Sequence, residues 1–190
     1  GTTALCAQPD SLDYRSDYYS AKRAQQERVA VQPQHIVMLG NSLTERGAWA
    51  DLLQDSLVVN RGIGGDCVAG MTARLGAIIA GKPRALFLMA GVNDLIFSRI
   101  TPEALLGQYE RLLPLDAAQN EEYFAGKNAR IEAFNALLRD MARRRGLDYI
   151  DIRSRMVRDG KMPAEYTVDG IHLNAAGYAV WVDVLRPYLP

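Results

Sequence analysis

The sequence lacks any excess of charge and any long apolar run. Its 190 residues carry 22 lysines and arginines against 22 aspartates and glutamates, so the formal net charge is zero. A chain without net charge has no overall field that would attract nucleic acid or an anionic membrane, and we expect neither as a partner. No apolar stretch approaches the roughly 18 residues that span a bilayer, so we expect no stable membrane insertion. A chain of this length can bury one substantial core, which favours a single domain.

Cysteine and histidine are also scarce. The two cysteines, Cys6 and Cys67, are too few for a disulfide framework or a zinc site. The two histidines are His35 and His172, so any histidine that does chemistry is one of these. Residues 1–8 are typical of the tail of a secretory signal sequence, which favours export to a periplasm or the cell exterior.

Short apolar runs alternate with helical patterns along the chain. This alternation predicts an α/β protein whose parallel sheet is covered by helices on both faces. Residues 1–34 are expected to form an N-terminal tail and a surface helix, and residues 35–190 the rest of a single domain. The predicted strands are 35–39, 57–59, 85–89 and 148–152, and the predicted helices are 16–30, 48–54, 68–79, 103–112, 128–145 and 174–185.

Three predicted strands are followed by residues suited to catalysis. In an open parallel sheet the ligand site forms outside the carboxyl ends of the strands, so functional groups are expected there. Ser42 follows the first strand with its hydroxyl at the sheet edge, although a turn or helix-cap serine is the alternative. Glycines in residues 62–65 follow the second strand and leave N–H groups free to donate, without the spacing of a dinucleotide fingerprint. Asn93 follows the third and could donate its amide to an oxyanion or cap a helix.

Asp169 and His172 follow the last predicted strand after a loop. An aspartate three residues before a histidine can orient the imidazole through one ring nitrogen and leave the other free to take a proton. His35 lies at the amino end of the first strand, on the opposite edge, so we interpret it as structural. Because no second imidazole or thiolate is available at the edge that carries His172, we expect no metal, and we expect no cofactor.

Taken together, these residues form four blocks in a fixed order. With them the sequence resembles the SGNH/GDSL hydrolase superfamily, and it is most similar to the platelet-activating-factor acetylhydrolase-like branch. The resemblance implies a three-layer α/β/α, flavodoxin-like SGNH hydrolase domain over residues 35–190. It also implies a serine esterase that works through an acyl-enzyme. The blocks are residues 40–43, 60–66, 91–94 and 169–172.

The resemblance also implies a role for each residue. Ser42 would be the nucleophile, with Asp169 and His172 completing a catalytic triad. The Ser42 N–H, the Gly65 N–H and the Asn93 side chain would form the oxyanion hole. The expected substrate is a small-molecule ester with a small acyl group, such as an O-acetyl group of a carbohydrate. The alternatives are a lysophospholipase or thioesterase for longer chains and a non-catalytic binding protein on the same fold.

Two residues just past Asn93 are candidates for an acyl pocket. Ile96 and Phe97 could line such a pocket, or they could be core residues of a short helix. Composition and spacing do not distinguish these two possibilities.

The sequence departs from the family pattern in two places. Asn41 stands where the family usually has an aspartate, which changes a neighbouring charge but removes no member of the machinery. The second departure is the lack of a strand-length apolar run between the helix ending at Leu112 and the final strand. Because adjacent strands lie about 4.8 Å apart, losing one would carry His172 away from Ser42. We therefore hypothesise that a segment near Leu112–Leu113 is absent from this sequence but present in the working protein.

Overall fold

A parallel sheet organises the molecule. The computed structural model describes residues 8–112, 118–120 and 128–190. Within these residues five parallel strands pair in the order β2-β1-β3-β4-β5. The strands are β1 (Ile36–Gly40), β2 (Val58–Gly62), β3 (Ala85–Met89), β4 (Ala118–Asn120) and β5 (Tyr149–Ile150).

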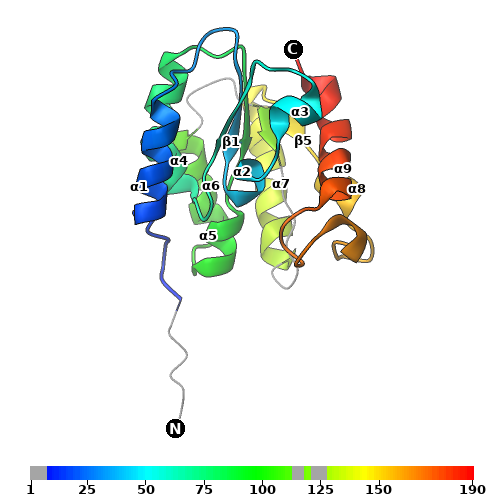
Figure 1. Ribbon diagram of the computed structural model, residues 1–190. Coiled ribbons are helices and arrows are strands. Elements are labelled where there is room, and N and C mark those ends of the chain that lie inside the picture. Colours follow the sequence, from blue (N-terminus) through cyan, green and yellow to red (C-terminus); the bar gives the residue numbers. More distant parts are fainter. Residues whose placement is uncertain (1–7, 113–117, 121–127) are drawn as a thin grey trace.

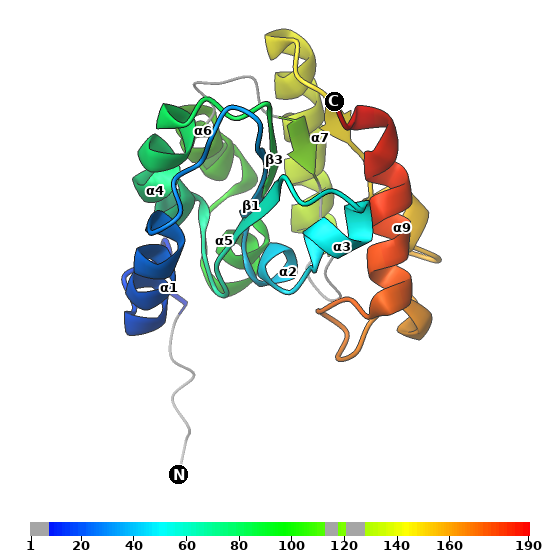
Figure 2. The same cartoon turned by 45° about the horizontal axis from the view of Figure 1, so that its top comes forward.

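Helices cover both faces of this sheet. Figure 2 shows α4 and α6 on one side of β1 and β3, with α3 and α9 on the other. Helix α1 lies beside α4 in both views (Figure 1). The helices are α1 (Asp17–Glu27), α2 (Ser42–Glu45), α3 (Trp49–Leu53), α4 (Val68–Ala80), α5 (Val92–Phe97), α6 (Pro102–Leu112), α7 (Asn128–Arg145), α8 (Arg153–Met156) and α9 (Ala175–Leu185), with short 3₁₀ turns at Ala164–Tyr166 and Arg186–Tyr188.

The sheet separates two hydrophobic cores because side chains alternate along each strand. On β1, Val37 and Leu39 pack into one core with residues of α4, α5, α6 and α7. Ile36 and Met38 face the other core, which contains residues of α3, α8 and α9. Every residue of β1 is buried, as expected for a central strand covered on both faces. The predicted α/β class with a parallel sheet is confirmed.

Strand β2 is longer than its apolar run. The sequence predicted an end at Val59, but the strand continues through Gly62. Its register with β1 explains the extension, because Met38, Leu39 and Gly40 pair with the last three residues of β2. Backbone pairing with a central neighbour therefore overrides the weak strand propensity of asparagine and glycine.

The expectation that no strand lies between the helix ending at Leu112 and the final strand is wrong. Strand β4 occupies that position and pairs with β3 on one side and β5 on the other. Its sequence is Ala-Gln-Asn, so it has no apolar run by which to recognise it. With β4 in place, β5 is not shifted toward β3, so the chain that follows β5 can still bring His172 to Ser42. The junction at Leu112–Leu113, where we hypothesised an absent segment, lies outside the described residues.

Candidate active site

Ser42 lies at the carboxyl end of β1, as the first residue of the short helix α2. Asn41 is the N-cap of that helix, and its side-chain oxygen accepts a hydrogen bond from Leu43 N at 3.0 Å. Asn41 is 1% exposed. An asparagine retains the oxygen that this cap needs, so the replacement of the usual aspartate preserves the local geometry. The Ser42 N–H lies in the first turn, where no intrahelical acceptor is available.

His172 is oriented by a loop that makes most of its hydrogen bonds internally. Asp169 Oδ2 contacts His172 Nδ1 at 2.7 Å. Asp169 Oδ1 accepts hydrogen bonds from the N–H groups of Ile171 at 2.9 Å and His172 at 2.7 Å. Thr167 Oγ1 donates to His172 O and accepts from Gly170 N. These bonds fix the imidazole relative to the carboxylate.

The free nitrogen of this imidazole points at the serine. His172 Nε2 lies 3.3 Å from Ser42 Oγ, across 130 residues of sequence. Catalytic hydrogen bonds are often longer before a substrate binds, so this distance is compatible with proton transfer. The hydrogen bonds from the His172 N–H and ring, and from the Ile171 N–H, hold the pKa of Asp169 well below its usual range. Asp169 is therefore ionised at neutral pH.

Two further groups lie beside Ser42. Gly65 has a φ of 75°, a left-handed conformation that glycine adopts without strain. Asn93 lies in the first turn of α5, and its Nδ2 donates to Asp66 O at 2.8 Å. Because an amide carries two hydrogens, this bond orients Asn93 and leaves one donor for a ligand. A cleft of about 650 Å³ contains Ser42, His172, Gly65 and Asn93 together.

Glu45 connects helix α1 to the loop after β2. It accepts hydrogen bonds from Tyr18 Oη at 2.6 Å and from Gly64 N at 2.9 Å, and it pairs with Lys22 at 2.9 Å. Burial raises the pKa of Glu45, but the bonds from Tyr18 and Lys22 outweigh it, so the net pKa is lowered. Glu45 stays ionised and holds Gly64 next to Gly65.

Two buried aspartates lie behind the cleft. Burial raises the pKa of Asp66, although the neighbouring Arg74 guanidinium offsets part of this effect. Burial also raises the pKa of Asp94, to about 6, against a hydrogen bond from Val68 N at 3.2 Å. Neither carboxyl lines the cleft, so both act on the site only through its supporting structure.

The structure separates the two candidate pocket residues. Phe97 lines the cleft and is 52% exposed. Ile96 is buried in the core packed against α4 and α7, and it is not among the cleft residues. Ile96 is therefore a core residue, because its side chain is buried whereas that of its neighbour Phe97 is exposed. His35 stays at the amino end of β1, where its Nδ1 accepts a hydrogen bond from Gln32 N at 3.0 Å.

Several cleft residues were missed from the sequence. Glu45 had a usable signal, because it lies three residues after Ser42 and so shares its helical face. Helix α1 had none, since it is far from the four blocks in sequence. The missed residues that line the cleft are Tyr18, Lys22, Glu45 and Arg46, whereas Gly64 and Ile171, which also line it, lie within the predicted blocks.

Neither a metal centre nor a membrane span is found in the described part of the chain. No group of three or more His, Cys, Asp and Glu residues there could hold a metal ion. None of the helices in the described ranges combines the length and apolar character that crossing a bilayer requires.

Comparison with solved structures finds the same fold in several bacterial proteins. A protein from Bacteroides fragilis described as an acylhydrolase is 22% identical, with a TM-score of 0.77 over 92% of this chain and 97% of that chain. A GDSL-like lipase from Bacteroides thetaiotaomicron is 18% identical, with a TM-score of 0.73 over 90% of this chain and 96% of that one. A variant of an acetyl-xylooligosaccharide esterase from Geobacillus is 19% identical, with a TM-score of 0.63 over 82% and 94%.

Sequence comparison identifies the family. No curated protein matches the chain. The model of the GDSL-like lipase/acylhydrolase family matches residues 38–180, which is most of the chain and includes Ser42, Asn93 and His172. The chain therefore belongs to the GDSL-like lipase/acylhydrolase family and is an ester hydrolase.

Proposed function

We propose that this protein hydrolyses small acyl esters through an acyl-enzyme on Ser42. The observation that carries the proposal is the line of contacts from Asp169 Oδ2 to His172 Nδ1 and from His172 Nε2 to Ser42 Oγ. A serine hydroxyl is a weak nucleophile at neutral pH until an adjacent base accepts its proton. Here His172 is that base, and Asp169 fixes the tautomer with Nε2 free.

The first half of the reaction forms the acyl-enzyme. Ser42 Oγ attacks the ester carbonyl carbon while its proton moves to His172 Nε2. The carbonyl oxygen becomes an oxyanion, and the Ser42 N–H, the Gly65 N–H and Asn93 Nδ2 donate to it. The tetrahedral intermediate then collapses, the bond to the alcohol oxygen breaks, and His172 returns the proton to that oxygen.

The second half restores the enzyme. Water enters the cleft, loses a proton to His172 Nε2 and attacks the acyl carbon. The same three donors receive the second oxyanion. Collapse releases the carboxylic acid, and the proton passes from His172 back to Ser42 Oγ. Asp169 stays ionised throughout and stabilises the imidazolium that forms in each half.

The composition of the cleft favours a small acyl group on a polar alcohol, such as an O-acetyl group of a carbohydrate. Among the side chains that line the cleft, Phe97 and Ile171 are hydrocarbon, whereas Lys22, Glu45 and Arg46 are charged. A long acyl chain needs an apolar groove, because each buried methylene contributes about 0.8 kcal/mol only when it leaves water. Charged lining residues suit a hydrated leaving group better.

Two measurements test this proposal. A fluorophosphonate should label the wild type and fail to label Ser42→Ala, since labelling needs an activated serine. Rates on p-nitrophenyl esters should be highest for acetate and butyrate and fall toward palmitate. Equal labelling of Ser42→Ala would overturn the mechanism, and a maximum at octanoate or longer would overturn the small-acyl assignment in favour of a lipase-type activity.

A further inference from the structure

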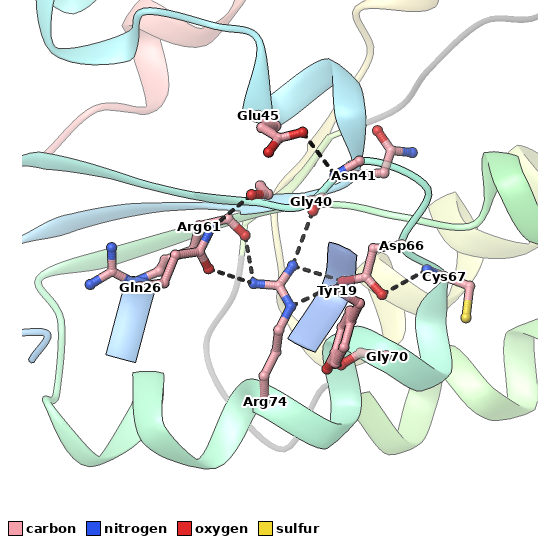
Figure 3. Close-up of polar contacts among 12 residues, drawn as sticks. Tyr19, Gln26, Gly40, Asn41, Glu45, Arg61, Asp66, Cys67, Gly70 and Arg74 are labelled. Carbon is pink, nitrogen blue, oxygen red and sulfur yellow. Dashed lines mark hydrogen bonds and ion pairs between the residues drawn. The ribbon is translucent and has the colours of Figure 1, made fainter. Parts of the chain in front are cut away.

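A buried arginine joins the strand ends on which the cleft is built. Arg74 on α4 is 3% exposed, and its Nε and Nη2 contact Asp66 Oδ2 at 3.0 and 2.8 Å. Its Nη1 donates to Arg61 O at 2.6 Å and reaches Gln26 Oε1 at 3.4 Å. Its Nη2 donates to Gly40 O at 3.1 Å. Figure 3 shows the guanidinium reaching from α4 to Asp66 on one side and to the carbonyls of Gly40 and Arg61 on the other.

Two of these partners, Gly40 and Asp66, lie within two residues of a proposed oxyanion donor. Gly40 is the last residue of β1 and lies two residues before Ser42. Asp66 directly follows Gly65. A single guanidinium therefore holds the backbone next to both proposed N–H donors, Ser42 and Gly65. Arg74 itself does not line the cleft.

The third donor depends on the same aspartate. Asp66 O accepts the hydrogen bond that orients Asn93, at 2.8 Å. Asp66 Oδ1 also accepts from Cys67 N at 2.9 Å, which ties the carboxylate to the backbone of the next residue at the start of α4. A shift of Asp66 would move the carbonyl that holds the Asn93 amide.

Stability alone does not account for this arrangement. Removing two charges from water is costly, and replacing a buried ion pair by apolar side chains is often neutral or stabilising. Geometry gives a better reason, because a guanidinium presents five donors in a rigid plane. A lysine would neutralise Asp66 but could not also reach two carbonyls from fixed directions.

We propose that Arg74 is a positioning residue that sets the geometry of the oxyanion hole by holding the ends of β1 and β2 to Asp66. The inference rests on the proposed function, in which Ser42, Gly65 and Asn93 bind the oxyanion. Arg74 touches no substrate and acts through these three groups.

Arg74→Lys is the primary test, because it keeps the positive charge and loses the planar set of guanidinium donors. With p-nitrophenyl acetate we expect kcat to fall about 10- to 100-fold while KM changes less than about 3-fold, since misplaced donors weaken the transition state more than the bound ester. Asp66→Asn is a second variant of nearly equal shape that removes the ion pair, and it should show the same pattern. Wild-type kcat in either folded variant would overturn the proposal.

Leu138→Ala is the stability control. Leu138 lies on α7, is 2% exposed and packs in the hydrophobic core, and it neither lines the cleft nor hydrogen-bonds Arg74. Losing its side chain should lower Tm while leaving kcat within about 3-fold of wild type. An equal loss of kcat in Leu138→Ala would show that Arg74 acts only through general stability.

A double-mutant cycle with Asn93→Ala locates the effect. If Arg74 acts through Asn93 and its neighbours, Arg74→Lys should cost less in the Asn93→Ala background than in the wild type. Full additivity of the two losses would contradict a shared oxyanion hole.

A measurement without turnover separates this inference from the proposed function. The NMR signals of the Gly65 amide and the Asn93 side-chain amide should shift in Arg74→Lys and stay near their wild-type positions in Leu138→Ala. Unchanged signals in Arg74→Lys would overturn the positioning role even if the enzyme were active. Shifted signals in a protein that hydrolyses no tested ester would instead overturn only the proposed function.

Discussion

The two halves of the candidate site are built in opposite ways. The loop that carries Asp169 and His172 is largely exposed, and the hydrogen bonds that orient the imidazole join residues within five positions of one another. The ends of β1, β2 and β3 are buried, and contacts such as Arg74 to Gly40 and Asn93 to Asp66 join residues 27 or more positions apart.

This difference predicts different responses to substitution. The proposed acid/base pair, Asp169 and His172, depends on local turn chemistry, so changes there should affect the reaction and leave the fold intact. The proposed oxyanion donors depend on tertiary packing, so changes beneath them should affect the fold and the reaction together.

His172→Ala should have the largest effect on rate. We expect kcat to fall on the order of 10⁴- to 10⁶-fold, because His172 Nε2 is the base in contact with Ser42 Oγ. Tm should change little, since the loop keeps its backbone hydrogen bonds. Steady-state kinetics with p-nitrophenyl acetate and thermal denaturation measure both. The double variant with Ser42→Ala should be no slower than either single one, and an additive loss would contradict a shared proton transfer.

Asp169→Asn should have the next largest effect on rate. We expect a loss of about 10³- to 10⁴-fold in kcat, because an amide facing Nδ1 favours the wrong imidazole tautomer. The pKa of Asp169 is lowered in the folded protein. Its carboxylate therefore contributes to stability above the pKa of the unfolded chain, and this contribution is lost only as pH falls through the lower pKa of the folded state. Loss of wild-type rate at mildly acidic pH should therefore not come from this carboxyl. Asp159→Asn, on an exposed neighbouring loop, is the control and should keep full activity.

Asn93→Ala tests the buried half. We expect kcat to fall about 10²- to 10³-fold, as for other side-chain donors to an oxyanion. KM should change much less, because the donor acts mainly on the developing charge. Asn135→Ala is the matched control, since Asn135 is buried on α7 and does not line the cleft. A raised KM with unchanged kcat would assign Asn93 to substrate binding instead.

Asp94→Asn should have the smallest effect on rate, and its main effect should be on stability. The pKa of Asp94 is raised to about 6 in the folded protein. The neutral carboxyl therefore favours the folded state fully below about pH 3.8, and this contribution is lost as pH rises through about 6. The amide stays neutral, so the variant should be more stable than wild type at pH 7, by up to about 3 kcal/mol. The gain should vanish near pH 4, as measured by urea denaturation at each pH. A constant difference from pH 4 to 8 would contradict the raised pKa.

Sequence reasoning found the residues whose positions follow from local rules. Ser42 and Asn93 were found because each directly follows an apolar strand, and the carboxyl ends of parallel strands share one edge of the sheet. Asp169 and His172 were found because their spacing in a single loop already implies contact. Strand β3 has the predicted bounds, since its apolar run and its pairing coincide.

The remaining features depend on contacts that no local pattern reveals. Strand β4 is recognisable only from its neighbours, because Gln119 and Asn120 pair through their backbone. Arg74 reads as an ordinary polar residue of an amphipathic helix until the ends of β1 and β2 are placed above it. Ile96 and Phe97 are adjacent in sequence and both apolar, and only the packing of α5 separates core from cleft.

Helix α1 gives the cleft a wall from outside the family pattern. It lies before residues 38–180, which carry that pattern, yet Tyr18 and Lys22 form part of the cleft wall. Substitutions in this helix would therefore reshape the wall while leaving Ser42 and His172 unchanged. Glu45 is the coupling point, because it binds α1 with one oxygen and Gly64 with the other. A change in α1 that removes both partners of Glu45 would thus release Gly64, and the wall and the loop after β2 would shift together.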